Sequence, residues 1–250
     1  MTADKRPSDR DPAAQALSFG LAAERYDANR PTYPPAALTW ALGTPARHVV
    51  DLGAGTGILT RVLLALGHRV LPVEPDAGMR DRLATTTPDA VPVEGSAERI
   101  PLEDGAVDAV VAGQSYHWFD PEPAHAEIAR VLRSGGIFAP VWNIRDDSVP
   151  WVARLTEILD DPRDHRTHEG LLEHPDFGPE FGPVASKGFQ HEVPMTADRL
   201  VALVSTRSYY LTATGQRQAE IETQIRELAA GLPEVFPLPY LTMIYKAVRN

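Results

Sequence analysis

The feature that most constrains the fold of this chain is the glycine-rich stretch Asp51–Gly57, with the sequence Asp-Leu-Gly-Ala-Gly-Thr-Gly. The apolar run over 48–52 indicates a buried strand, and the segment 58–67 carries apolar residues at helical spacing. Three glycines within five residues permit a tight turn and the close approach of a ligand to the backbone. Because open α/β sheets bind ligands beyond the carboxyl ends of their strands, next to helix N-termini, we expect a nucleotide-type ligand here.

Strands and helices alternate along the first 145 residues, as in consecutive βαβ units. We predict strands at 48–52, 69–74, 90–95, 106–114 and 137–143, and helices at 58–67, 76–86 and 121–136. Asp76 is a plausible N-cap, and Gly135–Gly136 would close the last of these helices. Beyond residue 145 the alternation is lost. We predict a strand at 185–195, a segment 196–211 that is helical at its start, a helix at 217–232, and a final strand at 240–248.

Composition excludes several classes of function. The 250 residues contain no cysteine, which rules out disulfides, thiolate zinc sites and a cysteine nucleophile. A net charge of −10 without a run of more than two basic residues disfavours nucleic acid as a partner. No run of 18 apolar residues predicts a membrane span. The polar residues 1–14 lack the apolar core of a secretory signal, so we expect a disordered tail and a cytoplasmic protein, either monomer or homodimer.

Two ligands compete for the glycine-rich loop, a dinucleotide and S-adenosylmethionine. The dinucleotide pattern G-x-G-x-x-G needs a third glycine at Ile58, or at Thr60 in the other register. A carboxylate at Asp51 suits a ligand that carries ammonium and sulfonium charges, and it would be a poor neighbour for a pyrophosphate. An NAD-dependent oxidoreductase is therefore the weaker alternative.

The chain resembles the class I S-adenosylmethionine-dependent methyltransferases. The resemblance lies in Asp51–Gly57, in Glu74 at the end of the second strand, and in "GSAERIP" (95–101), "QSYHWFD" (114–120) and "IARVLRSGGIFAPVWN" (128–143). It implies an α/β, Rossmann-like sheet of seven mostly parallel strands with an antiparallel last strand, helices on both faces, and a helical cap. The segment "FGLAAERYDANRPTYP" (19–34) is similar to a small-molecule branch that includes trans-aconitate methyltransferase-like proteins.

We expect residues 15–250 to form one methyltransferase domain. Its parts would be N-terminal cap helices (15–45), a cofactor-binding core (46–145), a cap and substrate region (146–215), and a closing helix and strand (216–250).

The resemblance implies S-adenosylmethionine as cofactor and S-adenosylhomocysteine as product. Glu74 would accept hydrogen bonds from ribose hydroxyls. Arg30 and Tyr26 would approach the cofactor's carboxylate and sulfonium, although they fit a tie between two helices equally well. The full implied set is Tyr26, Arg30, Asp51, Gly53, Ala54, Gly55, Thr56, Gly57, Glu74, Pro75, Met79, Ser96, Ala97, Glu98, Gln114 and Ser115.

Methyl transfer is an in-line displacement that needs alignment and the exclusion of water. A hydroxyl acceptor also needs a base, for which His117 is the candidate, while a carboxylate acceptor needs a cationic clamp instead. His117 could equally be a contact residue, and Arg145 and Arg207 could equally form surface ion pairs. The expected substrate contacts are Tyr33, His117, Trp118, Trp142, Arg145, Arg207 and Tyr210.

We therefore predict an enzyme that transfers a methyl group from S-adenosylmethionine to a small molecule, most plausibly to an oxygen atom. A protein that binds S-adenosylmethionine for a rearrangement, a cyclisation or regulation is the alternative. His165, His168 and His174 lie in a polar loop without a matching carboxylate pattern, so no metal is expected.

Overall fold

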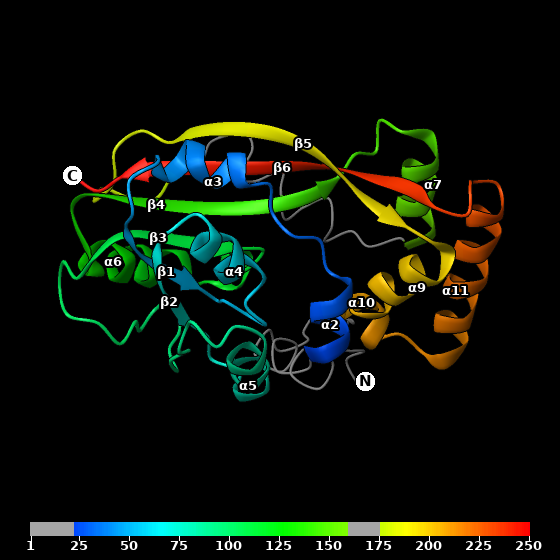
Figure 1. Ribbon diagram of the computed structural model, residues 1–250, viewed down its shortest axis with the longest axis horizontal. Coiled ribbons are helices and arrows are strands. Elements are labelled where there is room, and N and C mark those ends of the chain that lie inside the picture. Colours follow the sequence, from blue (N-terminus) through cyan, green and yellow to red (C-terminus); the bar gives the residue numbers. More distant parts are fainter. Residues whose placement is uncertain (1–22, 160–175) are drawn as a thin grey trace, which may run out of the picture.

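A computed structural model describes residues 23–159 and 176–250 as a six-stranded sheet with helices on both faces and a helical cap at one end (Figure 1). The strand order is β2-β1-β3-β4-β6-β5. The first four strands run parallel, and β6 runs antiparallel to both of its neighbours. The bounds are β1 His48–Leu52, β2 Arg69–Val73, β3 Val107–Gly113, β4 Leu132–Arg145, β5 Ala185–Met195 and β6 Phe236–Val248.

The predicted α/β class and the antiparallel last strand are confirmed, but within the described residues the sheet has six strands and not the seven expected. The segment 90–95 contributes only one parallel bridge, between Val93 and Val73 at the edge beside β2. Val93 still donates its N–H to the Pro72 carbonyl at 2.9 Å. Pro92 precedes it and has no N–H to give to a ladder, which accounts for the interruption.

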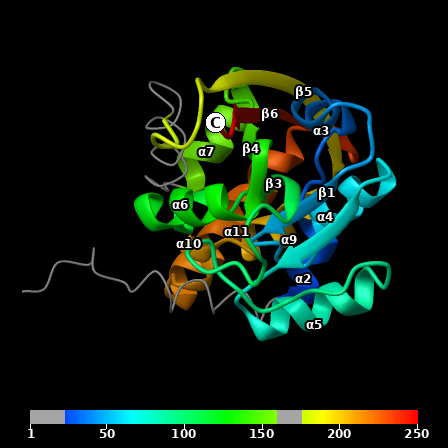
Figure 2. The same cartoon turned by 90° about the vertical axis from the view of Figure 1, so that its left-hand side faces the viewer.

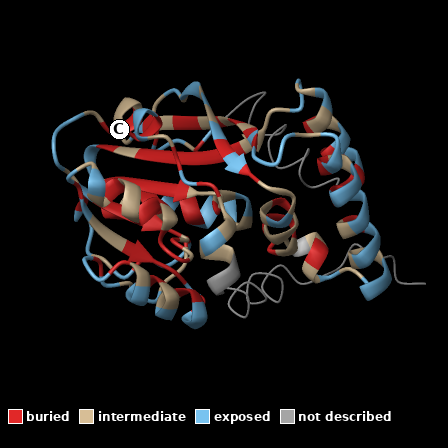
Figure 3. Cartoon of the chain, turned by 45° about the vertical axis from the view of Figure 1, so that its right-hand side comes forward, coloured by how far each residue is buried: buried red, intermediate tan, exposed pale blue. Residues whose placement is uncertain are grey.

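The helices form two layers around the sheet (Figures 1 and 2). Leu38 and Leu42 of α3 pack with Leu59 and Leu63 of α4 on one face, and α6 covers the other face. Figure 3 shows the buried residues concentrated in the sheet between these layers. The bounds are α2 Ala23–Asn29, α3 Pro35–Leu42, α4 Ile58–Ala65, α5 Ala77–Thr86, the 3-10 helix η2 Tyr116–Trp118, α6 Pro121–Val131, α7 Pro150–Leu159, α9 Ala197–Ser205, α10 Ser208–Leu211 and α11 Gly215–Ala230.

One helix prediction is corrected at its C-terminal end. Helix α6 ends at Val131 and not at 136, because Leu132 takes up extended dihedrals and starts β4. In the segment 196–211, predicted to be helical at its start, α9 ends at Ser205 and α10 follows after a break at Thr206. The predicted cap at Asp76 is confirmed, because its carboxylate accepts the N–H of Met79 at 2.8 Å.

The cap consists of α7, α9, α10 and α11, which gather around the ends of β5 and β6 (Figure 1, right). It has a hydrophobic core of its own, in which Leu200, Leu203, Ile221 and Ile225 are buried. The segment 146–215, for which we expected a cap and substrate region, thus contributes both cap helices and a strand of the sheet. Among the described residues, no helix is long and apolar enough to cross a membrane.

Candidate functional site

The glycine-rich loop leaves β1 at the carboxyl edge of the sheet and opens α4. Gly53, Gly55 and Gly57 all have positive φ, at 68°, 56° and 87°. A Cβ at Gly53 would lie 2.6 Å from that of Ser115, and a Cβ at Gly57 would lie 2.8 Å from Leu83, so these two glycines are required by packing. A Cβ at Gly55 would meet nothing within 4 Å. Gly55 therefore faces open space, where a ligand can reach the backbone.

Two buried carboxyl groups stand at the tips of the neighbouring strands β1 and β2. Asp51 accepts a hydrogen bond from the Thr60 hydroxyl at 2.6 Å through Oδ2, while its buried Oδ1 has no hydrogen-bond partner among the described residues. Glu74 accepts the N–H of Gly55 at 2.9 Å and that of Asp76 at 3.0 Å. The loop is thus fastened to β2 by a side chain whose two oxygens are both engaged.

Burial changes the ionisation of both carboxyl groups. Desolvation raises the pKa of Asp51 to about 7, and the hydrogen bond from Thr60 opposes this increase. Burial also raises the pKa of Glu74, against the two backbone hydrogen bonds. A cation placed against the unpaired Oδ1 of Asp51 would stabilise the ionised carboxylate and lower its pKa again.

The end of β3 carries the next part of the site. Gln114 adopts a left-handed backbone with φ 56°, which is uncommon for a residue with a side chain. Its side-chain amide donates to the Asn143 carbonyl at 3.0 Å, and Ser115 donates its hydroxyl to the Leu52 carbonyl at 2.7 Å. The two residues are therefore held by β4 and β1.

Asn143, which we did not count among the site residues, anchors this region. Its amide donates to the Thr32 carbonyl at 3.0 Å, and its side-chain oxygen accepts from the Thr242 hydroxyl at 2.6 Å. A sequence signal for this role is its place at the carboxyl end of a strand beside an apolar run.

The short helix η2 turns its residues in opposite directions. Tyr116 points inward, where its hydroxyl lies 2.8 Å from Nε2 of His125 and its ring packs against Phe138 and Phe177. Trp142 belongs to the same aromatic cluster and is 1% exposed, so the structure places it in the core and away from an accessible substrate surface. His117 is exposed, and its ring lies against Trp118 at an interplanar angle of 42°, with 4.8 Å between ring centroids.

The residues expected on the adenine side lie around α5 and the turn after residue 95. Met79 and Ala97 are buried, whereas Pro75 and Glu98 are exposed. Ser96 exchanges two backbone hydrogen bonds with Arg99, at 3.1 and 3.2 Å. These residues flank the tip of β2 that carries Glu74.

Helix α2 lies between the core and the cap (Figures 1 and 2). On the cap side, Arg30 donates to the hydroxyl and the carbonyl of Thr206, both at 3.1 Å, and stacks over the Tyr26 ring at 4.4 Å. Arg30 thus ties α2 to the C-terminal end of α9, whereas the predicted tie was a helix–turn–helix within the N-terminal cap. Tyr33 is buried against Gly113 at the end of β3. A Cβ added at Gly113 would lie 2.8 Å from the Tyr33 hydroxyl oxygen.

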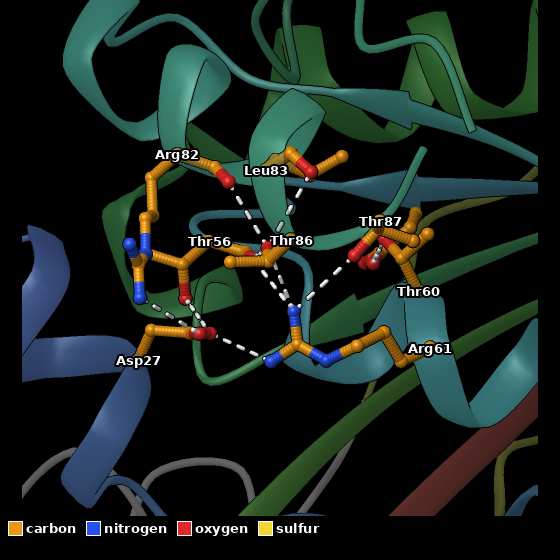
Figure 4. A network of polar contacts seen from close by, with 9 residues as sticks. Asp27, Thr56, Thr60, Arg61, Arg82, Leu83, Thr86 and Thr87 are labelled. Carbon is orange, nitrogen blue, oxygen red and sulfur yellow. Dashed lines mark hydrogen bonds and ion pairs between the residues drawn. The ribbon is translucent and has the colours of Figure 1, made fainter. Parts of the chain in front are cut away.

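On the core side, α2 holds the glycine-rich loop through Asp27 (Figure 4). The Asp27 carboxylate accepts from the Thr56 hydroxyl at 2.9 Å and from the Arg61 guanidinium at 2.6 Å, with Arg82 at 3.8 Å. Arg61 also donates to the Thr56 carbonyl at 3.0 Å. Sequence reasoning missed this network, because its members lie far apart in the chain.

The remaining predicted substrate contacts lie on different elements of the structure. Arg145 lies at the end of β4, and Arg207 lies between α9 and α10. Tyr210 is buried in the cap and donates its hydroxyl to the Glu222 carboxylate. His165, His168 and His174 fall outside the described residues. Within 23–159 and 176–250, no group of three or more His, Asp or Glu residues could hold a metal ion.

Comparisons with known proteins agree on one activity. Residues 50–139 match a methyltransferase domain family. The chain is 40% identical over 237 residues to an uncharacterized methyltransferase of Mycobacterium tuberculosis, covering 93% of this chain and 96% of that protein. A solved structure of a proposed type II methyltransferase from Anaeromyxobacter dehalogenans has a TM-score of 0.65 at 27% identity, covering 88% of this chain and 97% of the other.

A more distant structure has the same fold. Geranyl diphosphate C-methyltransferase from Streptomyces coelicolor A3(2), solved with Mg²⁺, geranyl diphosphate and S-adenosyl-L-homocysteine, has a TM-score of 0.52 at 14% identity. The match covers 98% of this chain and 100% of the Streptomyces chain.

We predict that Gly55→Ala blocks the cofactor without unfolding the protein. The methyl group would occupy the open space above the loop and weaken S-adenosylhomocysteine binding by about a hundredfold, measured by calorimetry. Gly67→Ala is the matched control, since Gly67 also has positive φ and an open surrounding. Both variants should lose roughly 1 kcal/mol of stability. Equal cofactor affinity in the two variants would contradict the assignment of the loop.

We also predict that Asp27→Ala weakens cofactor binding. Without its carboxylate, Thr56 and Arg61 lose charge-assisted hydrogen bonds, and S-adenosylhomocysteine affinity should fall by about tenfold. Asp198→Ala is the control, because it removes an exposed ion pair with Arg226 in the cap. If both variants bind the cofactor as the unmodified protein does, the network serves only to pack α2.

Proposed function

Because this chain belongs to the class I S-adenosylmethionine-dependent methyltransferases, we propose that it methylates an oxygen atom of a small-molecule acceptor. The reaction would take place at the carboxyl edge of the sheet, between the glycine-rich loop and the cap. The observation that supports this place best is the buried, unpaired Oδ1 of Asp51 beside the open backbone at Gly55.

The residues present fit the cofactor. Bound S-adenosylmethionine supplies a methyl group on a positively charged sulfur. Asp51 offers that cation an unpaired carboxylate oxygen, and Gly55 leaves room for the cofactor against the loop. Glu74 would accept the ribose hydroxyls in addition to, or in place of, the N–H groups that it now holds. Because the chain belongs to a methyltransferase family, we no longer consider the alternative of an NAD-dependent oxidoreductase.

The bridge that α2 makes between the core and the cap favours a small acceptor. Helix α2 is fastened to the core through Asp27 and to the cap through Arg30, so it bridges the two parts of the molecule beside the glycine-rich loop. A cover of this kind excludes water from the reacting atoms and leaves little room for a macromolecular acceptor. The trans-aconitate methyltransferase-like branch remains a prediction.

His117 is the candidate base for a hydroxyl acceptor. It is exposed on η2, which directly follows Gln114 and Ser115 at the end of β3. An imidazole near neutral pH can take the proton that a hydroxyl loses as it attacks the methyl group. A carboxylate acceptor attacks in its ionised form, so no residue needs to remove a proton from it.

Transfer of labelled methyl from S-adenosylmethionine to a panel of small acids, alcohols and phenols tests this function. We predict that His117→Ala lowers kcat for a hydroxyl acceptor by about a hundredfold or more, and leaves kcat for a carboxylate acceptor unchanged. His48→Ala, at another exposed histidine, is the control. A hydroxyl acceptor that is methylated at the same rate by His117→Ala removes this residue as the base. If the protein binds the cofactor but methylates no member of the panel, the result favours the non-methylating alternative.

The raised pKa of Asp51 makes cofactor binding dependent on pH. A cation binds to the ionised carboxylate, whereas below about pH 7 the free protein holds this group in its neutral form. S-adenosylmethionine affinity should therefore fall as the pH is lowered, by about tenfold per unit once the pH is below the pKa. At pH 8, Asp51→Asn should bind S-adenosylmethionine more weakly than the unmodified protein does. The affinity of this variant should be nearly independent of pH. Calorimetry between pH 6 and 8 checks this, and a slope that persists in Asp51→Asn would assign it to another group, such as Glu74.

A further inference from the structure

A series of hydrogen bonds crosses the sheet from β5 to the end of β3. Nδ1 of His191, on β5, lies 3.1 Å from the Thr242 hydroxyl. Thr242, on β6, donates to the side-chain oxygen of Asn143 on β4 at 2.6 Å, and the Asn143 carbonyl accepts from the Gln114 amide at 3.0 Å. His191 is therefore linked by hydrogen-bonded neighbours to a residue at the cofactor edge of the sheet.

These hydrogen bonds fix which ring nitrogen of His191 carries the proton. The Asn143 amide donates to the Thr32 carbonyl, so the Asn143 side-chain oxygen faces Thr242 and can only accept. The single hydroxyl hydrogen of Thr242 is used in that bond. Nδ1 of His191 must therefore donate its N–H to the Thr242 oxygen. Burial lowers the pKa of His191, so the ring is neutral near pH 7 and Nε2 carries a free lone pair.

Nε2 of His191 is buried and has no hydrogen-bond partner within residues 23–159 and 176–250. A buried acceptor without a donor costs free energy, which a bound donor would recover. The ring nitrogens of His68 are also buried without partners there, but His68 precedes β2 and lies at the opposite, amino-terminal edge of the sheet. His191 combines an unmatched acceptor, a fixed tautomer and a link to the cofactor edge.

His191 lies where the sheet meets the cap. It pairs in register with Tyr240 of β6, which pairs on its other side with Arg145, the last residue of β4. His191 is thus level with the carboxyl end of β4, at the edge where open α/β sheets bind ligands. Its ring stacks on that of Tyr240 at 5.4 Å between centroids, and Tyr240 belongs to the hydrophobic core of the cap. Figure 1 shows β5 and β6 running on from the sheet into the cap.

We propose that Nε2 of His191 accepts a hydrogen bond from a hydroxyl or N–H group of the methyl acceptor. This inference rests on the proposed function and adds a residue that selects the acceptor. In the order β3-β4-β6-β5, His191 is three strands from Gln114, or about 14 Å at the usual strand spacing. It therefore holds a second polar group of the acceptor, remote from the atom that receives the methyl group. An ether oxygen or an ionised carboxylate has no hydrogen to offer and is not held.

The test uses the full-length protein with nitrogen-15 in its histidines, loaded with S-adenosylhomocysteine. NMR spectra that correlate ring nitrogens with ring protons should show His191 with its proton on Nδ1. The probes are the diols resorcinol and 1,4-butanediol, compared with their dimethyl ethers 1,3-dimethoxybenzene and 1,4-dimethoxybutane. We expect a diol to shift the Nε2 resonance of His191 and the ethers to leave it unchanged. The ring resonances of His68 are the internal control and should not move.

Two substitutions separate binding of the acceptor from support of Thr242. His191→Asn keeps an N–H donor for Thr242 and puts nothing in the place of Nε2, whereas His191→Gln supplies an acceptor near that place and loses the donor. Both lose the stacking on Tyr240. By calorimetry, His191→Asn should weaken diol binding by about tenfold and His191→Gln by less, with S-adenosylhomocysteine affinity unchanged in both. His48→Asn, at an exposed histidine, should change neither affinity.

Several results would overturn the proposal. They are a proton on Nε2, a His191 resonance that no diol moves, equal shifts from diols and ethers, or tighter diol binding by His191→Asn than by His191→Gln.

Methyl transfer distinguishes such a failure from that of the proposed function. For an acceptor with a second hydroxyl or N–H group, His191→Asn should raise KM about tenfold and leave kcat nearly unchanged, because the reacting atoms are not touched. If such acceptors are methylated with an unchanged KM, only the role of His191 is wrong. If diols bind at His191 as expected and no acceptor is methylated, the hydrogen-bond site stands and the proposed function fails.

Discussion

The cofactor edge of this protein depends on the two hydrogen bonds that the Glu74 carboxylate accepts, from the N–H of Gly55 and from that of Asp76. One oxygen fixes the glycine-rich loop, and the other fixes the start of α5. The loop reaches the tip of β2 a second time, through the N–H groups that Gly53 and Ala54 donate to the Val73 carbonyl. A buried carboxyl group with a raised pKa thus sets the distance between the two strand tips that frame the ligand.

Helix α2 joins two hydrophobic units that are also linked by β5 and β6. One unit packs the α3, α4 and α6 layers onto the sheet, and the other packs α7, α9 and α11 into the cap. Asp27 of α2 and Arg30, which directly follows this helix, hold opposite partners, the loop residue Thr56 and the cap residue Thr206. The position of this helix is therefore set by charged and polar contacts at both ends of the site.

Local patterns in the sequence were enough to predict the βαβ order, the glycine-rich loop, the Asp76 cap and the two acids at the strand tips. Patterns were not enough where tertiary context decides. Leu132 belongs to a core that draws the chain into β4 earlier than the glycines at 135 and 136 suggested. Trp142 alternates with Asn143 along β4, and only the pairing of the sheet decides that the ring faces the core. The Asp27 network joins segments that lie between about 30 and 55 residues apart, which no local periodicity reveals.

Strand β6 runs through both the cap and the sheet. Its first residues, Phe236 to Tyr240, are buried in the cap, and the residues from Ile244 onward are buried in the sheet. Since β5 follows β6 along its whole length, a continuous two-stranded ribbon runs through both units. The cap is therefore stiffly coupled to the sheet on this side and lacks a flexible hinge there. On the opposite side, within the described residues, the Asp27 and Arg30 side chains link the core and the cap through α2, so the two sides of the molecule couple these parts in different ways.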